Sequence, residues 1–129
     1  MTSYRTPLSR ARGHGAAKHG VTHWIAERVS SVALIPLVLW AIYAGLQMAR
    51  SDYAGAVAWL QGSALNPVLL VLLIAVSFWH MHSGMRVIIE DYIAKPSSRM
   101  ALLLLNLFVC TLGGALAGFS ILKIALGGA

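Results

Sequence analysis

Three long apolar runs constrain the fold of this chain more than any other feature of its sequence. They cover about residues 29–48, 67–89 and 100–122, and each meets the requirement of about 20 residues for a helix that crosses the hydrocarbon core of a bilayer. Backbone groups find no water there, so each run must satisfy them internally, as an α-helix does. The sequence therefore predicts an all-α integral membrane protein with three transmembrane helices. In the third run, Gly113, Gly114 and Gly118 have the small-residue spacing that favours close helix packing.

The first 28 residues are basic where the rest of the chain is apolar. They carry five of the ten Lys and Arg residues and lack the apolar stretch of a signal peptide. We expect residues 1–28 to form a basic cytoplasmic tail and residues 29–129 to form a three-helix membrane anchor domain. A net charge of +6 is also typical of nucleic-acid-binding proteins. No domain remains outside the membrane to present such a surface, however, so we expect the bilayer and no nucleic acid as a partner.

The distribution of basic residues predicts the orientation of the three spans. Besides the tail, the second connector (residues 90–99) carries Lys95 and Arg99, whereas the first connector (residues 50–66) and the C-terminal end carry one basic residue each. Cytoplasmic loops are enriched in Lys and Arg, so the N-terminus and the second connector should face the cytoplasm. The basic tail also weakly resembles a mitochondrial transit peptide, but its glycines interrupt any amphipathic pattern. We therefore favour the bacterial inner membrane over the mitochondrial one.

His80 lies inside the second span, where ionisable side chains are costly and usually have a partner or a function. A helix turns about 100° per residue, so Gly84 and Asp91 share a face with His80, whereas His82 points to the opposite side. An imidazole in this setting can form structural hydrogen bonds, relay protons or ligate a metal such as haem iron. A purely structural role for His80 is the alternative.

Two neighbouring features favour the haem ligand. Gly84 leaves room for a flat macrocycle, and Arg28, at the start of the first span, lies on the side where it could pair with a propionate. Because His82 points away, the second axial ligand would come from another chain. The protein would then not act alone.

Asp91 and Tyr92 end the second span at the membrane boundary. A phenol can donate a hydrogen bond to the carbonyl of a lipid-soluble quinone, and a nearby carboxylate can help to supply protons. The alternative is an interfacial tyrosine beside a solvated charge, which is common in membrane proteins.

Taken together, these residues resemble those of the hydrophobic membrane anchor subunit of succinate dehydrogenase (respiratory complex II), of the D type. The resemblance covers about residues 22–124. Besides the three spans, it rests on two motifs: His80-x3-Gly84-Met85-x5-Asp91-Tyr92, and Ala26-Glu27-Arg28-Val29-Ser30-Ser31-Val32-Ala33-Leu34.

The resemblance implies a role for each candidate residue. His80 would be an axial ligand of a haem b shared with a companion subunit, Arg28 would lie near the haem propionates, and Gly84 would pack on the haem. Tyr92 would bind ubiquinone, with Asp91 close by. The three helices would then form half of a heterodimeric helix bundle.

The resemblance also implies an activity and partners. The chain would be a subunit of an enzyme, succinate:quinone oxidoreductase, and would not be catalytic alone. Its partners would be a flavoprotein subunit, an iron–sulfur subunit and a second membrane anchor, the cytochrome b subunit. The chain has no flavin fingerprint and no cysteine cluster, so succinate would be oxidised elsewhere in the complex.

Two alternatives stay open at this point. The chain could be the companion cytochrome b subunit or a fumarate reductase anchor, or it could be a structural or assembly membrane protein without a cofactor. The sequence does not distinguish ubiquinone from menaquinone.

Overall fold

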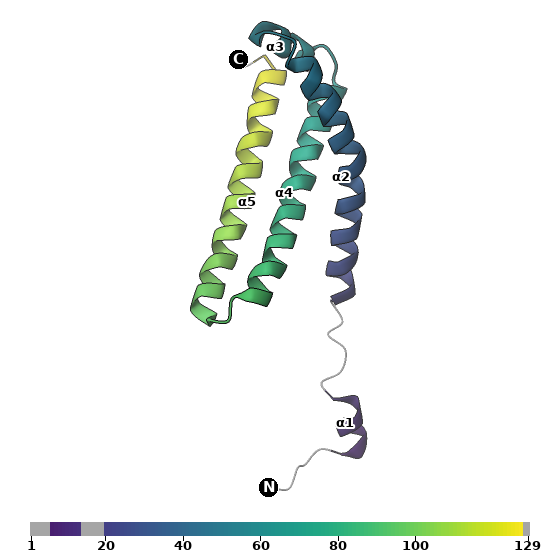
Figure 1. The fold of residues 1–129 in the computed structure, drawn as a ribbon, viewed down its shortest axis with the longest axis vertical. Coiled ribbons are helices and arrows are strands. Elements are labelled where there is room, and N and C mark those ends of the chain that lie inside the picture. The colour runs from purple at the N-terminus through teal and green to yellow at the C-terminus, as the bar shows by residue number, and fades with distance from the viewer. Residues whose placement is uncertain (1–5, 14–19, 128–129) are drawn as a thin grey trace.

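The computed structural model describes residues 6–13 and 20–127, and helices make up almost all of this part (Figure 1). Parts of the predicted basic tail, residues 1–5 and 14–19, lie outside the described residues, as do residues 128 and 129. The helices are α1 (Pro7–Arg12), α2 (Gly20–Met48), α3 (Tyr53–Gln61), α4 (Leu65–Tyr92) and α5 (Pro96–Ala125). No strand occurs among the described residues, so the predicted all-α fold is confirmed.

The three long helices are long and apolar enough to cross a membrane, as predicted. They contain 29, 28 and 30 residues. At 1.5 Å per residue they extend about 42–45 Å, which matches the thickness of a bilayer with its headgroup regions. Each helix is therefore longer than the apolar run that predicted it. The difference is largest for α2, which begins at Gly20 instead of residue 29. Hydropathy marks only the apolar residues, whereas the helix continues into the polar residues before them.

The connectors are shorter than predicted because the helices continue into them. The expected second connector, residues 90–99, is reduced to residues 93–95. Pro96 does not break a helix but begins α5, a position where its missing N–H group costs no hydrogen bond. The side chain of Arg99 donates from Nε to the carbonyl of Ile93, 2.9 Å away, just after α4 ends. In the first connector, Asp52 caps α3 by accepting the N–H of Gly55 at 2.8 Å.

The central helix of the three is α4, which packs against α2 on one side and α5 on the other. Within the described part of the chain, α2 and α5 do not contact each other. The start of α2 and the α4–α5 connector lie at one end of this layer, and α3 and the C-terminus lie at the other (Figure 1). Only five apolar residues of the described chain are buried: Leu37, Ala44, Leu60, Ile89 and Cys110. The helices thus form an open layer with its apolar sides exposed.

The contact between α4 and α5 depends on two of the three predicted packing glycines. A Cβ atom at Gly113 would lie 2.7 Å from Cε1 of Phe78, and one at Gly114 would lie 3.3 Å from Cγ of the same ring. The prediction of close packing is therefore confirmed for this pair. At Gly118 an added Cβ would meet nothing within 4 Å among the described residues, so this glycine makes no close helix contact within the chain.

Candidate functional site

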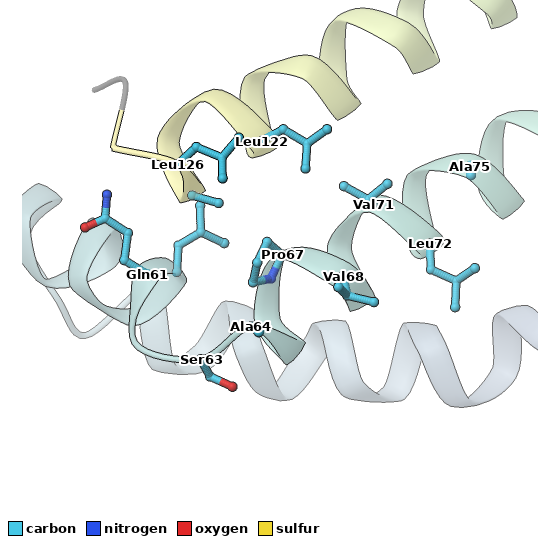
Figure 2. Close-up of a pocket in the computed structure, with 12 residues that line it drawn as sticks. Gln61, Ser63, Ala64, Pro67, Val68, Val71, Leu72, Ala75, Leu122 and Leu126 are labelled. Atoms are coloured by element: carbon cyan, nitrogen blue, oxygen red, sulfur yellow. The ribbon is translucent and has the colours of Figure 1, made fainter.

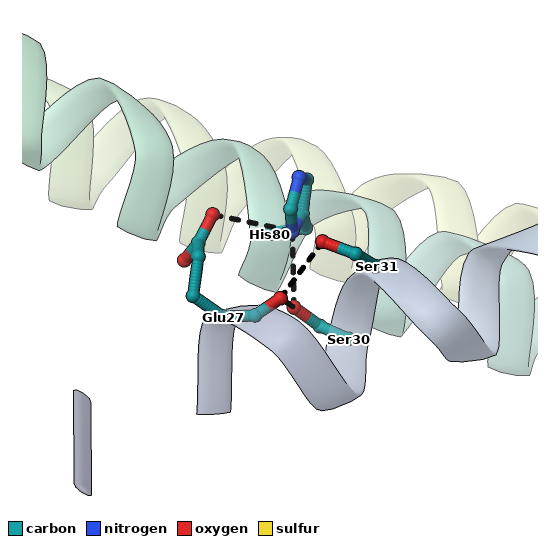
Figure 3. A network of polar contacts seen from close by, with 4 residues as sticks. All are labelled: Glu27, Ser30, Ser31 and His80. Atoms are coloured by element: carbon teal, nitrogen blue, oxygen red, sulfur yellow. Dashed lines mark hydrogen bonds and ion pairs between the residues drawn. The ribbon is translucent and has the colours of Figure 1, made fainter. Parts of the chain in front are cut away.

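His80 forms the centre of a polar cluster between α4 and the start of α2 (Figure 3). Its Nδ1 atom lies 3.0 Å from Oγ of Ser30 and 3.3 Å from Oε1 of Glu27. Ser30 is buried, whereas the side chains of His80 and Glu27 are 33% and 25% exposed. Ser30 and Glu27 are three residues apart, so one face of α2 presents both groups to the same imidazole nitrogen.

The partners of Ser30 fix the position of the proton on His80. The Ser30 hydroxyl donates to the backbone carbonyl of Glu27 at 2.9 Å, so its oxygen is free to accept from His80. The Glu27 carboxylate can only accept. In the neutral ring, both neighbours therefore favour a proton on Nδ1, and the lone pair then lies on Nε2. In Figure 3, Nε2 lies on the side of the ring away from Glu27 and Ser30.

His82 faces α5 and has the opposite arrangement. Its backbone carbonyl accepts a hydrogen bond of 3.0 Å from Nδ2 of Asn106, and the same amide nitrogen lies 3.1 Å from Nδ1 of His82. The thiol of Cys110 donates to Oδ1 of Asn106 at 3.3 Å, in agreement with this orientation of the amide. Since Nδ1 of His82 accepts, the neutral ring carries its proton on Nε2 and has no free lone pair there.

Gly84 lies one turn after His80 and faces the same acidic side chain. A Cβ atom added at Gly84 would lie 3.7 Å from Oε1 of Glu27, an ordinary van der Waals separation. The other carboxylate oxygen, Oε2, is buried without a hydrogen-bond partner among the described residues. The absence of a side chain at Gly84 therefore provides space beside the Glu27 carboxylate, next to His80.

Arg28 is exposed, and its guanidinium carbon lies 5.3 Å above the centre of the Trp24 ring. Such a cation–π contact contributes about 0.5–1 kcal/mol at an exposed site. No salt bridge to Arg28 is found in the described part of the chain. Its N–H donors remain available to an anion at the same end of the molecule.

Asp91 and Tyr92 are the last two residues of α4. Both are exposed, and the Tyr92 side chain is 81% exposed. The charged residues that precede them in α4 are paired with each other, since Nε of Arg86 donates to Oε1 of Glu90 at 2.8 Å. Asp91 and Tyr92 therefore present a carboxylate and a phenol that are open to a ligand or partner beyond this chain.

The structure has two hollows that bear on the site. A groove of about 440 Å³ lies between α2 and α4 beside Ser30, the partner of His80, and its lining consists of Ala26, Val29, Ser30, Ala33, Ala75, Val76 and Trp79. A larger hollow of about 680 Å³ lies between α3, the start of α4 and the end of α5 (Figure 2). Its walls are apolar and lie toward the end of the molecule opposite Tyr92. The larger hollow is therefore not part of the cluster around His80.

Sequence reasoning singled out His80, Gly84 and Arg28 but gave no role to Glu27 or Ser30. Glu27 is the only carboxylate in the first 51 residues. A single carboxylate beside an apolar span could have marked it as a candidate site residue. What the sequence did not provide was the register between α2 and α4 that brings Glu27 to His80.

Comparison with known proteins gives one consistent family. Residues 2–116 match the family described as succinate dehydrogenase/fumarate reductase transmembrane subunit. A succinate dehydrogenase hydrophobic membrane anchor subunit of Rickettsia conorii is 31% identical over 107 residues, which cover 83% of this chain and 85% of the relative. The subunit of the same name from Rickettsia bellii is 31% identical over 78% of this chain and 80% of its own.

A relative from Reclinomonas americana, named succinate dehydrogenase membrane anchor subunit, is 31% identical over 64% of this chain and 71% of its own. No solved structure matches the chain.

Proposed function

Because this chain belongs to the family of succinate dehydrogenase/fumarate reductase transmembrane subunits, we propose that it anchors a succinate:quinone oxidoreductase to the membrane and supplies one axial ligand of a haem b. The family and the three membrane helices support the anchoring role. The curated relatives bear the name of the succinate dehydrogenase anchor, which favours this enzyme over fumarate reductase.

The observation that carries the haem proposal is the placement of Ser30 and Glu27 at Nδ1 of His80, which favours the tautomer with its lone pair on Nε2. A metal-bound histidine usually donates its other ring N–H to a carboxylate or another acceptor, which fixes the tautomer. Nδ1 of His80 lies at hydrogen-bond distance from the Ser30 hydroxyl and 3.3 Å from the Glu27 carboxylate, which favours this form, whereas His82 has its acceptor nitrogen turned to Asn106. Of the two histidines on α4, His80 is therefore the one suited to ligate haem iron.

The surrounding residues suit a flat, acidic macrocycle. The groove beside Ser30 has an apolar lining of alanines, valines and Trp79. Gly84 adds no side chain next to His80, and Arg28 offers N–H donors for a propionate. Haem b, when bound, supplies a one-electron carrier whose potential depends on its axial ligands and their hydrogen bonds. The second axial ligand would come from the companion cytochrome b subunit.

We assign the quinone contact of this chain to Tyr92, with Asp91 beside it. The exposed Tyr92 hydroxyl can donate to a quinone carbonyl and orient the ring, while Asp91 can hold a proton or an ordered water near it. Both residues lie at the end of the layer predicted to face the cytoplasm of a bacterium. The flavoprotein and iron–sulfur subunits would dock on this side and deliver electrons from succinate.

The test is the absorption spectrum of the purified complex carrying His80→Ala or His82→Ala. We expect His80→Ala to abolish or strongly shift the haem b bands and His82→Ala to leave haem coordination intact. If only His82→Ala disturbs the spectrum, the ligand assignment is wrong. If the wild-type complex contains no haem, the chain is an anchor without a cofactor.

A further inference from the structure

We infer that Glu27 is a positioning residue for His80 and that its carboxylate lowers the reduction potential of the haem. This inference rests on the proposed haem ligand but adds a residue and a property that the ligand assignment does not require. A neutral acceptor such as the Ser30 hydroxyl would be enough to hold the ring. The carboxylate adds a negative charge next to the ring.

The geometry directs the charge of Glu27 at His80. Oε1 lies 3.3 Å from Nδ1, and Oε2 is buried without a partner in the described residues. The adjacent cation, Arg28, is stacked on Trp24. Among the described residues, therefore, no side chain donates a hydrogen bond to the carboxylate, and His80 is its ion-pair partner.

The chemical consequence concerns the strength of His80 as a ligand. The hydrogen-bond partner of Nδ1 is the Ser30 hydroxyl, and the Glu27 carboxylate lies 3.3 Å from the same atom as an ion-pair partner. A negative charge at this position increases the electron density and basicity of the imidazole. A more basic ligand stabilises ferric iron more than ferrous iron, so the reduction potential falls. Hydrogen bonding to an axial ligand is one of the means by which proteins tune haem.

Two local features hold Glu27 in this position. The hydroxyls of Ser30 and Ser31 both donate to the Glu27 backbone carbonyl, at 2.9 and 2.8 Å, and so brace this turn of α2 (Figure 3). On α4, Gly84 leaves the space beside Oε1 open, with 3.7 Å to the position of a Cβ atom. Gly84 thus has a role toward Glu27 in addition to the one proposed for it toward haem.

The experiment is a potentiometric titration of the haem absorbance in the assembled complex. Glu27→Gln keeps the size and an acceptor oxygen but removes the charge. We expect the ratio of ferrous to ferric haem at a fixed potential to rise about tenfold, which is about 59 mV for a one-electron couple. Ser30→Ala, which keeps the carboxylate, should produce a smaller rise and provides an independent measurement if Glu27→Gln assembles poorly.

The matched control is Glu90→Gln, which makes the same change on α4 at a carboxylate paired with Arg86. It should leave the haem potential unchanged. The inference is overturned if His80→Ala removes the haem while Glu27→Gln retains the wild-type potential, whatever the potential of Ser30→Ala. If His80→Ala itself leaves the haem unaltered, the proposed ligand fails instead, and the two results are thus distinguishable.

Discussion

At the scale of single residues, two histidines on the same helix are given opposite chemistry by their neighbours. His80 meets acceptors, Glu27 and Ser30, and keeps the Nε2 lone pair, whereas His82 meets a donor amide from Asn106. Helical phase alone separates the two side chains onto different faces. It does not determine where the proton lies on each ring, because that depends on groups contributed by α2 and α5.

The exposed phenol of Tyr92 leads to a prediction about quinone reduction. Tyr92→Phe removes only the hydroxyl, and since the side chain is 81% exposed, we expect little change in stability. Loss of one hydrogen bond of about 1.4 kcal/mol to the quinone should lower kcat/KM for quinone about tenfold. Succinate-dependent reduction of quinone, measured beside reduction of a soluble artificial acceptor, tests this expectation.

Tyr53→Phe is a suitable control, because Tyr53 is 72% exposed and begins α3 at the opposite end of the layer. It should leave both rates unchanged. An equal loss of both reactions in Tyr92→Phe would contradict the assignment, since it would point to a general defect of the complex.

At the scale of helices, the sequence predicted the existence and order of all three spans but not where each helix ends. Hydropathy detects the residues in hydrocarbon, whereas helix ends depend on capping and loop geometry. Pro96 illustrates this limit, because a proline can break a helix or begin one. Here it begins α5, and Arg99 in the first turn of that helix contacts the carbonyl of Ile93. The short helix α3 follows from Asp52, whose capping role is local and was accessible from sequence.

The α4–α5 contact gives a prediction with an internal control. Gly113→Ala would place a Cβ atom 2.7 Å from the Phe78 ring, so the ring or the helices must shift. Overpacking of this kind costs about 1–3 kcal/mol. We expect a lower Tm of the detergent-solubilised complex, while Gly118→Ala, where nothing lies within 4 Å, should change the Tm little. Similar values of Tm for both variants would argue against the packing of Phe78 on Gly113.

At the scale of the whole molecule, the open arrangement of the helices explains why part of the site was inaccessible to sequence reasoning. Topology follows from three apolar runs, and it places Arg28 and Tyr92 toward one end. The rotation of α2 about its axis, which turns Glu27 and Ser30 toward His80, is set by packing between helices far apart in sequence. The apolar outer sides of the layer, left exposed in this chain, are suited to lipid and to a second anchor subunit.

The orientation of the molecule in the membrane is the prediction that connects these scales. Arg28, Arg86, Lys95 and Arg99 lie toward the end that contains the α4–α5 connector, whereas Arg50 and Lys123 lie toward the other end. This bias of four to two, before the other basic residues of the tail are counted, predicts that the α4–α5 connector lies in the cytoplasm. Tyr92 would then lie on the side where water-soluble subunits can deliver electrons.

Cysteine labelling in intact bacterial cells tests this orientation. In a Cys110→Ala background, which removes the only native thiol, a membrane-impermeant maleimide added outside should label Ser51→Cys in the α2–α3 connector. It should not label Ser97→Cys at the start of α5 until the membrane is opened. Both serines are exposed, so accessibility depends on the side of the membrane. Labelling of Ser97→Cys from outside would show the opposite orientation, with Tyr92 on the wrong side of the membrane for the proposed electron transfer.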